Sequence, residues 1–444
     1  MHSALPKVLH LLAGRPLVSH VLDAARTLSP RALCLVVGRD ADAVRQALTA
    51  PDLIIVTQDP PHGTGDAVRV ALAALPADGV TVVANGDCPL IPAATYGAMA
   101  EVAVGGHLAV LTTRVSDPTG LGRVVRDANG AVRAIVEDKD ASPAERAIDE
   151  IYTGVLAAPT PLLRRWVGAL RDDNAQREFY LTGILAMALA EHVAIEAHLA
   201  TDAAEGLGVN DRAQLAAIER IVQARQADRL LKAGTWVADP ARIDIRGTLE
   251  CGADVTIDVG CVFEGTVRLA DRANVAAYCV LKNVTIGADA RIAPFSHIEN
   301  ATIGANCRVG PYARLRPGAT LADDVHIGNF VEVKASTIGR GSKANHLAYI
   351  GDTTMGAHVN FGAGSITANY DGVNKFTTVI EDGASIGSNC VLVAPVTIGH
   401  GATIGGGSTI AREAPADSLT VARARQVNVP GWKRPVKKPK VQKG

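Results

Sequence analysis

The chain has 444 residues, more than the roughly 250–300 over which one hydrophobic core usually extends, so two domains are expected. Hydrophobic residues make up 48% and charged residues 20%, as in ordinary globular proteins, and the net charge of −1 excludes a general nucleic-acid binder with a basic field. No run of 18 apolar residues occurs, and the first ten residues, MHSALPKVLH, lack a signal-peptide pattern. The seven cysteines are scattered without a C-x-x-C pair, so we expect a cytoplasmic protein with reduced thiols, no membrane span and no zinc site.

Strand-like and helix-like segments alternate between residues 31 and 84. Apolar runs at 31–37, 53–57 and 79–84 predict strands, and the segments 41–49 and 66–75 between them predict helices. This order predicts a parallel sheet with helices on both faces. A helix over residues 210–232, ended by Gly234, is expected to connect this domain to the next.

After residue 240 an aliphatic residue recurs at every sixth position, often followed by glycine. Such a period is typical of a solenoid in which one hexapeptide forms one flat face and three close a triangular coil. The segment 362–378, GAGSITANYDGVNKFTT, interrupts the repeat, and we expect it to project from the stack and to carry part of a site. The longest uninterrupted series comprises Ile245, Cys251, Ile257, Phe263, Leu269, Val275 and Leu281, and a later one comprises Ile303, Val309, Leu315, Leu321, Ile327 and Val333.

Motifs in both halves of the chain resemble one family of two-domain enzymes. HIGNFVEVK, KANHLAYIGD and NFGAGSITANYDGVNKFTT are similar to the acetyltransferase domain of the bifunctional N-acetylglucosamine-1-phosphate uridyltransferase / glucosamine-1-phosphate acetyltransferases. LPKVLH, HGTGDA, NGDCPL, PTGLGRVVR and IVEDKDA are similar to the uridyltransferase domain of that family, and all motifs occur in the family's order. The resemblance implies a Rossmann-like α/β nucleotidyltransferase domain followed by a left-handed parallel β-helix, in a homotrimer that makes a cell-envelope precursor. The expected parts are the uridyltransferase domain (1–212), a linker helix (213–234), the β-helix domain (235–430) and a basic tail (431–444).

Acetyl transfer from acetyl-CoA to the amine of glucosamine-1-phosphate requires removal of a proton, and a neutral imidazole suits that task near pH 7. The resemblance identifies His346 as the base. Glu332 is a candidate to orient the His346 ring; the alternative is that Glu332 is an ordinary surface carboxylate without this role. Ser388 is a candidate donor to the thioester oxygen. The family's sugar-phosphate positions fall on Arg316, Lys334, Tyr349, Asn360 and Lys375, and its acetyl-CoA positions on Ala363, Asn369, Tyr370, Ser388, Gly406 and Arg423.

Transfer of UMP from UTP to N-acetylglucosamine-1-phosphate needs Mg²⁺ and cations around the phosphates. Asp87 follows the strand expected at 79–84, at the end of the sheet where α/β folds bind ligands, and a carboxylate suits Mg²⁺. The resemblance adds Asn210 as a second magnesium ligand; a helix N-cap is its other role, and both are compatible with its position. The remaining substrate positions of the family fall on Lys7, Gln58, Gly63, Thr64, Asn85, Gly86, Gly122, Glu137 and Tyr152.

Two departures from the family concern this second reaction. Tyr152 stands where the family has Asn, so a sugar hydrogen bond is either lost or replaced by the phenol. The sequence begins at the Met of the family's nucleotide loop, so the family's first strand, its loop glycines and a phosphate-binding Arg are missing from it. A start assigned to an internal Met is the favoured explanation, because most downstream positions are intact; a shortened gene is the other. We expect the chain as written to acetylate but to transfer UMP poorly or not at all.

Two other functions compete with a bifunctional enzyme. One is acetyl transfer alone, with an inactive N-terminal domain. The other is a non-enzymatic β-solenoid, such as an ice-binding or scaffold protein, for which flat arrays of Thr or one repeated surface residue per coil would be expected. The irregular insertion with Asn369, Tyr370 and Lys375 favours an enzyme.

Overall fold

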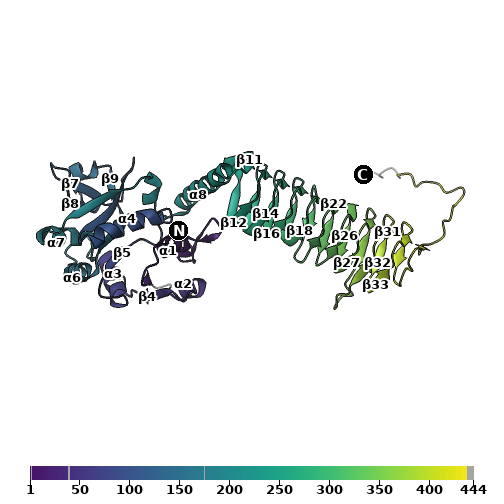
Figure 1. The fold of residues 1–444 in the computed structure, drawn as a ribbon, viewed down its shortest axis with the longest axis horizontal. Coiled ribbons are helices and arrows are strands. Elements are labelled where there is room, and N and C mark those ends of the chain that lie inside the picture. Colours follow the sequence, from purple (N-terminus) through teal and green to yellow (C-terminus); the bar gives the residue numbers. More distant parts are fainter. Residues whose placement is uncertain (2, 39–40, 175, 438–444) are drawn as a thin grey trace, which may run out of the picture. The chain divides into compact units, whose positions relative to one another are not determined.

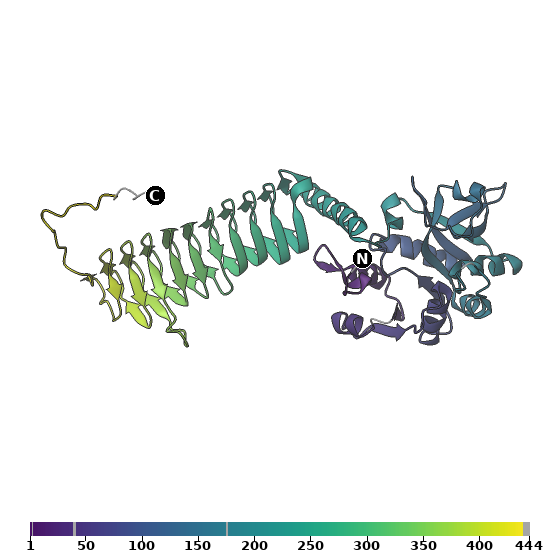
Figure 2. The same cartoon turned by 180° about the vertical axis from the view of Figure 1, so that it is seen from behind.

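The computed structural model describes residues 1, 3–38, 41–174 and 176–437. They form two compact units, whose helices and strands are labelled in Figure 1 and seen from behind in Figure 2. The first consists of residues 1–228 with 245–247, and the second of residues 229–244 with the chain from 248 onward. Within the described residues, no helix combines the length and the apolar character needed to cross a bilayer.

The first unit is built on a mixed sheet. Its strand order is β10-β6-β9-β7-β8, with β5 also paired to β9. The bounds are β5 Val80–Val83, β6 Leu108–Arg114, β7 Arg123–Arg126, β8 Val132–Val136, β9 Glu150–Pro159 and β10 Ile195–Leu199. The helices are α1 Leu17–Arg26, α2 Ala41–Ala47, α3 Thr64–Ala73, α4 Ala93–Val104, α5 Pro143–Arg146, α6 Thr160–Ala169, α7 Ile184–Ala190 and α8 Arg212–Lys232.

The prediction of a parallel sheet from residues 31–84 is confirmed for the strands Leu33–Val37 and Leu53–Thr57, which pair in parallel, but it is wrong for the sheet that contains β5. Strand β10 runs parallel to β6, but β9 runs antiparallel to β5, β6 and β7, and β7 and β8 form an antiparallel hairpin. The alternation at residues 31–84 contains none of the later strands that reverse direction. The loop between β7 and β8 is also too short for the crossover that a parallel pair needs.

Helices cover both faces of this sheet, as predicted. Successive residues of β6 alternate between two buried clusters, because neighbouring side chains of a strand point to opposite faces. Leu108 and Val110 pack with Trp166 of α6 in one cluster, while Ala109 and Leu111 pack with the helix α4 in the other. The strand is therefore buried along its length up to Arg114.

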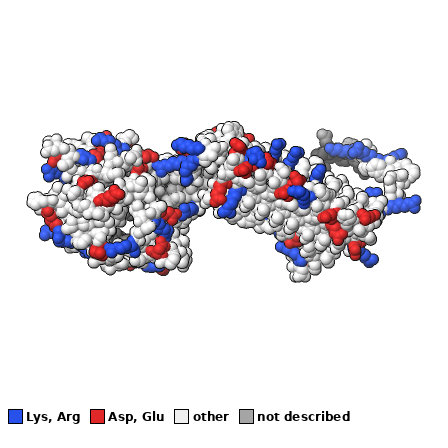
Figure 3. Space-filling view, in the orientation of Figure 1, with Lys and Arg blue, Asp and Glu red and all other residues white. Residues whose placement is uncertain are grey.

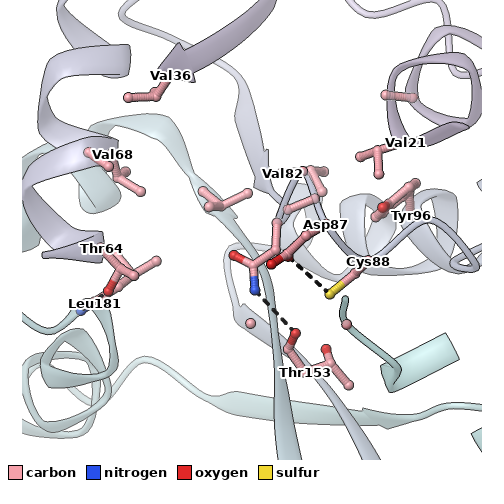
Figure 4. A pocket seen from close by; sticks show the side chains of 18 of the residues that line it. Val21, Val36, Thr64, Val68, Val82, Asp87, Cys88, Tyr96, Thr153 and Leu181 are labelled. Atoms are coloured by element: carbon pink, nitrogen blue, oxygen red, sulfur yellow. Dashed lines mark hydrogen bonds between the residues drawn. The ribbon is translucent and has the colours of Figure 1, made fainter. Parts of the chain in front are cut away.

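Strands β3 (Leu33–Val37) and β4 (Leu53–Thr57) form a separate parallel pair. Among the described residues, β3 pairs only with β4, and β5 pairs only with β9. Both β3 and β5 line one cavity of about 1730 Å³. Figure 4 shows Val36 and Thr64 on one side of this cavity, and Val82 and Asp87 on the other. The sheet is thus interrupted between two strands whose unpaired edges remain available.

The second unit is a parallel β-helix with three faces, whose stacked coils are clear in Figures 1 and 2. The first face comprises β11 Trp236–Val237, β13 Thr256–Ile257, β15 Asn274–Val275, β17 Arg291–Ile292, β19 Arg308–Val309, β22 His326–Asn329, β25 Lys343–His346, β28 Asn360–Phe361, β31 Ser385–Ile386, β34 Thr403–Ile404 and β36 Leu419–Thr420. The second face comprises β20 Arg314–Leu315, β23 Glu332–Lys334, β26 Tyr349–Gly351, β29 Ile366–Ala368, β32 Val391–Val393 and β35 Thr409–Ile410. The third face comprises β21 Thr320–Leu321, β24 Thr337–Ile338, β27 Thr353–Met355, β30 Thr378–Ile380 and β33 Val396–Ile398. In the first coils, the longer strands β12 Asp244–Cys251, β14 Val262–Leu269, β16 Val280–Ile286 and β18 His297–Ile303 run along both the second and third faces.

The six-residue period corresponds to the interior of this β-helix. Ile257, Val275, Ile292, Val309 and Ile327 are neighbours in register and are buried, so the repeated aliphatic residues form one continuous core. Only Cys251 of the longest series is not fully buried.

An outward row on the third face was not predicted. Thr285, Thr302, Thr320, Thr337 and Thr354 are register neighbours and exposed. Such β-branched residues suit an exposed pleated surface. This row has one threonine per coil, the repeated surface residue expected of a non-enzymatic β-solenoid. It is only one residue wide and does not form a flat array of threonines.

The projecting insertion is shorter than predicted. Residues 366–368 form β29 and continue the repeat, and only the chain from Asn369 to the start of β30 at Thr378 leaves the stack. An antiparallel bridge between Tyr370 and Lys375 closes this loop.

Candidate active sites

Most of the residues predicted for UMP transfer gather around the cavity of the first unit. They come from segments far apart in the sequence, which only the fold brings together. Eight of the eleven line the cavity: Thr64, Asn85, Gly86, Asp87, Gly122, Glu137, Tyr152 and Asn210. The other three do not line the cavity: Lys7, Gln58 and Gly63. Lys7 contacts Asp87 and Asn210, which do line it, and Gln58 donates to Gly63, which directly precedes the lining residue Thr64.

Asp87 and Asn210 both accept hydrogen bonds from one positively charged group, the Lys7 ammonium. Lys7 lies in a short 3₁₀ helix, Lys7–Leu9, and its ammonium donates to the Asp87 carboxylate and, at 3.1 Å, to Asn210 Oδ1. A carboxylate and an amide oxygen that converge on one positive charge fit the ligand preference of Mg²⁺. The N-cap role predicted for Asn210 is wrong, because Asp211 accepts the hydrogen bond from the Gln214 backbone at 2.8 Å.

The segment from Gln58 to Thr64 is held rigidly beside helix α3. The Gln58 amide donates to the Gly63 carbonyl at 3.0 Å and to the carboxylate of Asp66 at 2.8 Å. Gly63 has φ 100°, and a Cβ there would lie 2.8 Å from the Phe179 carbonyl oxygen, so only glycine fits. Asp66 was not predicted, although the motif HGTGDA contains it.

Of the residues predicted to contact the sugar, Gly122 is buried, and Asn85, Glu137 and Tyr152 are half-buried. Burial raises the pKa of Glu137, to which Thr182 donates a hydrogen bond at 3.4 Å. The Tyr152 hydroxyl is buried and has no hydrogen-bond partner among the described residues. Because this hydroxyl does not reach the cavity surface, the structure favours loss of the family's sugar hydrogen bond over its replacement by the phenol.

In the β-helix, four residues predicted for acetyl transfer occupy the same corner of successive coils. The register pairs Lys343 with Asn360, Asn360 with Ser385, and Ser385 with Thr403. The residues three positions further along each coil form what we call the corner column: His346, Ala363, Ser388 and Gly406.

Backbone hydrogen bonds hold this corner column together. His346 O accepts from Gly364 N at 3.3 Å, and Ser388 O accepts from Gly407 N at 2.8 Å. Arg423 Nη1 donates to Gly406 O at 2.5 Å, which adds the last predicted acetyl-CoA residue to the column. A row of small residues that ends at a histidine leaves room for an extended ligand whose reactive end meets the base.

Within one chain, the side chain that contacts the His346 ring is Asn329 and not Glu332. Asn329 lies one coil earlier in register with His346, and its Oδ1 lies 2.9 Å from His346 Nδ1. An Nδ1–H that donates to this oxygen leaves the lone pair on Nε2, as a base requires. Glu332 lies past the corner on the second face and accepts instead from Arg316 at 2.9 Å. Asn329 was missed because its link to His346 is a 17-residue spacing between coils.

A second group, the cationic cluster, lies on the second face and at the base of the inserted loop; it consists of Lys334, Lys375, Asp352 and Asn369. Asp352 accepts from Lys334 at 3.1 Å and also from the Asn369 amide. Burial opposes the charge of Lys334, but the Asp352 carboxylate raises its pKa above the usual value, whereas the Lys334 ammonium lowers the pKa of Lys375. Two adjacent ammonium groups with one carboxylate form a cationic position suited to a sugar phosphate. Asp352 was not predicted.

Three other predicted residues lie in different surroundings. Tyr349 extends over Gly351, where a larger residue would displace the phenol. Asn360 belongs to the first face, beside Lys343 and Ser385, and the structure does not bring it to Lys334 within one chain. Tyr370 is exposed, and its hydroxyl donates to Gly372 O at 2.5 Å.

These two sites define a class of protein. A hexapeptide β-helix with a histidine at the end of a row of small corner residues is the arrangement of an acyltransferase, and an α/β cavity with a converging carboxylate and amide is that of a nucleotidyltransferase. The chain is therefore a transferase with two separate sites.

Comparison with known proteins gives the particular family. Residues 1–151 match the MobA-like NTP transferase domain, residues 245–344 the GMPPB C-terminal domain, and residues 377–412 the bacterial transferase hexapeptide with six repeats. Bifunctional protein GlmU of Cupriavidus pinatubonensis is 56% identical over 99% of this chain and 97% of its own length, and that of Methylibium petroleiphilum is 55% identical over the same shares. A solved UDP-N-acetylglucosamine acyltransferase from Francisella novicida matches 36% of this chain and 65% of its own, with 20% identity and a TM-score of 0.30. The chain belongs to the GlmU family of bifunctional proteins, which confirms the predicted family and fold class.

Proposed function

We propose that this bifunctional transferase makes UDP-N-acetylglucosamine in two steps carried out by separate units. The β-helix acetylates glucosamine-1-phosphate with acetyl-CoA, and the α/β unit then joins UMP from UTP to the product with release of pyrophosphate. The corner column that ends at His346 is the observation that carries the acetyl-transfer assignment, and membership of the GlmU family supports both activities. We assign UMP transfer to residues 1–212, acetyl transfer to residues 235–430, a linking role to 213–234 and a tail to 431–444, of which residues 438–444 lie outside the described part.

In acetyl transfer, the sugar amine attacks the thioester carbon, the new C–N bond forms, and CoA leaves as its C–S bond breaks. His346 Nε2 accepts the amine proton, while Asn329 holds the opposite ring nitrogen. Ser388, on the same column, donates to the oxygen on which charge develops. Arg316, Lys334 and Lys375 supply positive charge for the phosphate.

In UMP transfer, a phosphate oxygen of N-acetylglucosamine-1-phosphate attacks the α-phosphorus of UTP, and pyrophosphate leaves. Mg²⁺, when bound, neutralises charge on the phosphates. Asp87 and Asn210 are the residues that would hold the ion, since they already converge on the Lys7 ammonium. Lys7 adds positive charge next to the phosphates, and Gln58, Gly63 and Thr64 lie where the family contacts uracil.

We further propose that the protein acts in the cytoplasm as a homotrimer in which neighbouring β-helices complete the acetyl-transfer site. Asn360 and the cationic cluster lie on different faces of one chain, so a second copy is needed to bring both to one sugar. In the four coils that precede the corner column, a ladder of stacked rings lies at centroid distances of 5.0–5.3 Å, each ring about half exposed. The ladder consists of Tyr278, Phe295, Tyr312 and Phe330. Because stacked rings expose their edges and not their faces, the ladder suits packing against apolar side chains of a partner.

Acidic and basic side chains are interspersed on the faces seen in Figure 3, which fits small-molecule substrates better than a nucleic-acid partner. The first test is release of CoA from acetyl-CoA by the purified chain, with glucosamine-1-phosphate or unphosphorylated glucosamine as acceptor. Rapid release that depends on the phosphate is expected from the cationic cluster. Equal rates with both sugars would contradict the assignment of Lys334 and Lys375.

A further inference from the structure

The Gln58 side chain is fixed in one orientation. It is 9% exposed, and its amide nitrogen donates both hydrogens, one to Gly63 O at 3.0 Å and the other to Asp66 Oδ2 at 2.8 Å. Its backbone nitrogen is also fixed, by a 2.8 Å hydrogen bond to Val37 O. No hydrogen bond to Gln58 Oε1 occurs among the described residues, so this carbonyl oxygen is the one polar atom of the side chain left for a ligand.

The opposite orientation of the amide is excluded by its partners. A backbone carbonyl can only accept, and so can an ionised carboxylate. Burial of Asp66 opposes ionisation, but the hydrogen bond from Gln58 and the ion pair with Arg69 lower its pKa below the usual value, so it stays ionised near neutral pH. Turning the Gln58 amide over would set its oxygen against both acceptors.

We propose that Asp66 is a positioning residue that fixes the acceptor of Gln58 toward the nucleobase and thereby selects uracil over cytosine. The inference rests on the proposed UMP transfer and on the assignment of Gln58 to uracil. Uracil carries a hydrogen on N3, which donates to a carbonyl oxygen. Cytosine carries a lone pair on N3, which repels that oxygen. A site built to pair a donor in this way discriminates strongly against a ligand that lacks it.

The test is binding of UTP and CTP to the full-length chain, each with Mg²⁺, by isothermal titration calorimetry. Asp66→Asn keeps the shape of the side chain but replaces one of the two acceptors by a group whose NH₂ can donate to Gln58 Oε1. Only the Gly63 carbonyl then opposes a turn of the Gln58 amide, so the amide can turn and present its NH₂ group. The ratio of the CTP to the UTP dissociation constant should fall at least about tenfold, because one buried polar contact of this kind is worth a factor of that order. CTP binding should improve in absolute terms, which a merely structural defect would not produce.

Arg69→Gln is the matched control. It removes the other partner of Asp66 and the cation above the Phe179 ring, 5.3 Å from its centroid, while the contact between Gln58 and Asp66 remains. Measured at alkaline pH, where the Asp66 carboxylate stays ionised without the ion pair, the CTP/UTP ratio should stay at the wild-type value even if the melting temperature falls. An unchanged ratio in Asp66→Asn, or an equal loss of affinity for both nucleotides, would overturn the inference and leave the proposed function standing. A wild type that binds neither nucleotide would overturn the proposed UMP transfer and this inference with it.

Discussion

The two units place their functional side chains by different means. In the β-helix, the residues of the corner column occupy equivalent positions in neighbouring coils, 17–25 residues apart in the sequence. The pairing of each coil with the next is therefore enough to place them all. In the α/β unit, Lys7, Asp87 and Asn210 converge from the beginning, middle and end of the unit. A repetitive fold therefore tolerates changes outside its column, whereas the α/β site depends on the integrity of a whole sheet.

The largest expected effect is that of a substitution in the β-helix that strongly reduces acetyl transfer and leaves UMP transfer intact. His346→Ala should reduce acetyl transfer by about 10²–10⁴-fold, because that is the usual contribution of a positioned general base. UMP transfer to supplied N-acetylglucosamine-1-phosphate should not change. Both rates are measured on one preparation, with His358→Ala, an exposed histidine outside the column, as the control. Acetyl transfer at a near wild-type rate would show that another group is the base.

The reciprocal variant is Asp87→Asn in the α/β unit. UMP transfer should fall by more than about 100-fold, since changes next to metal ligands alone cost 10–100-fold, while acetyl transfer stays at the wild-type rate. Release of pyrophosphate is measured over a range of Mg²⁺ concentrations. Asp78→Asn, an exposed carboxylate of the same unit paired with Arg31, is the control and should have little effect. Equal magnesium dependence in Asp87→Asn and wild type would contradict the assigned ligand.

The interrupted sheet suggests a gain-of-function experiment. An apolar strand fused before Met1, able to pair with β3 and β5, should raise the melting temperature of the α/β unit and the rate of UMP transfer, because it satisfies two unpaired edges and fills apolar space. Acetyl transfer should stay the same. Fusion of a polar, glycine- and serine-rich segment of equal length is the control. If neither fusion changed stability or rate, the unpaired edges would have no bearing on UMP transfer, and the expectation of poor transfer would lose its support.

The smallest expected effect concerns Asn329. Asn329→Ala removes the hydrogen bond to His346 and should lower acetyl transfer by up to about tenfold, the equivalent of one ordinary hydrogen bond. Asn329→Asp restores an acceptor and adds a negative charge, which should restore the rate and move the acidic limb of the pH–rate profile to higher pH, because a neighbouring carboxylate raises the pKa of a histidine. Glu332→Gln should leave that limb in place. A shift with Glu332→Gln, and none with Asn329→Asp, would reverse the assignment.

The comparison of the units also explains what could be predicted from the sequence. The six-residue period predicted the β-helix, and the family motifs predicted both the corner column and the residues around the cavity. The missed residues are partners of predicted ones. Asn329, Asp352 and Asp66 each hold a predicted side chain through a contact that spans a coil or a turn. The reversal of β9 was missed for the same reason, since strand direction depends on pairing with distant strands.

The most direct test of the account follows both products in one reaction. The purified chain is given glucosamine-1-phosphate, UTP and Mg²⁺, with or without acetyl-CoA, and free CoA and pyrophosphate are measured over time. We expect CoA first, then pyrophosphate only when acetyl-CoA is present. Pyrophosphate formed at full rate without acetyl-CoA, or no CoA at all, would contradict the proposal that the β-helix supplies the acetylated sugar to the α/β unit.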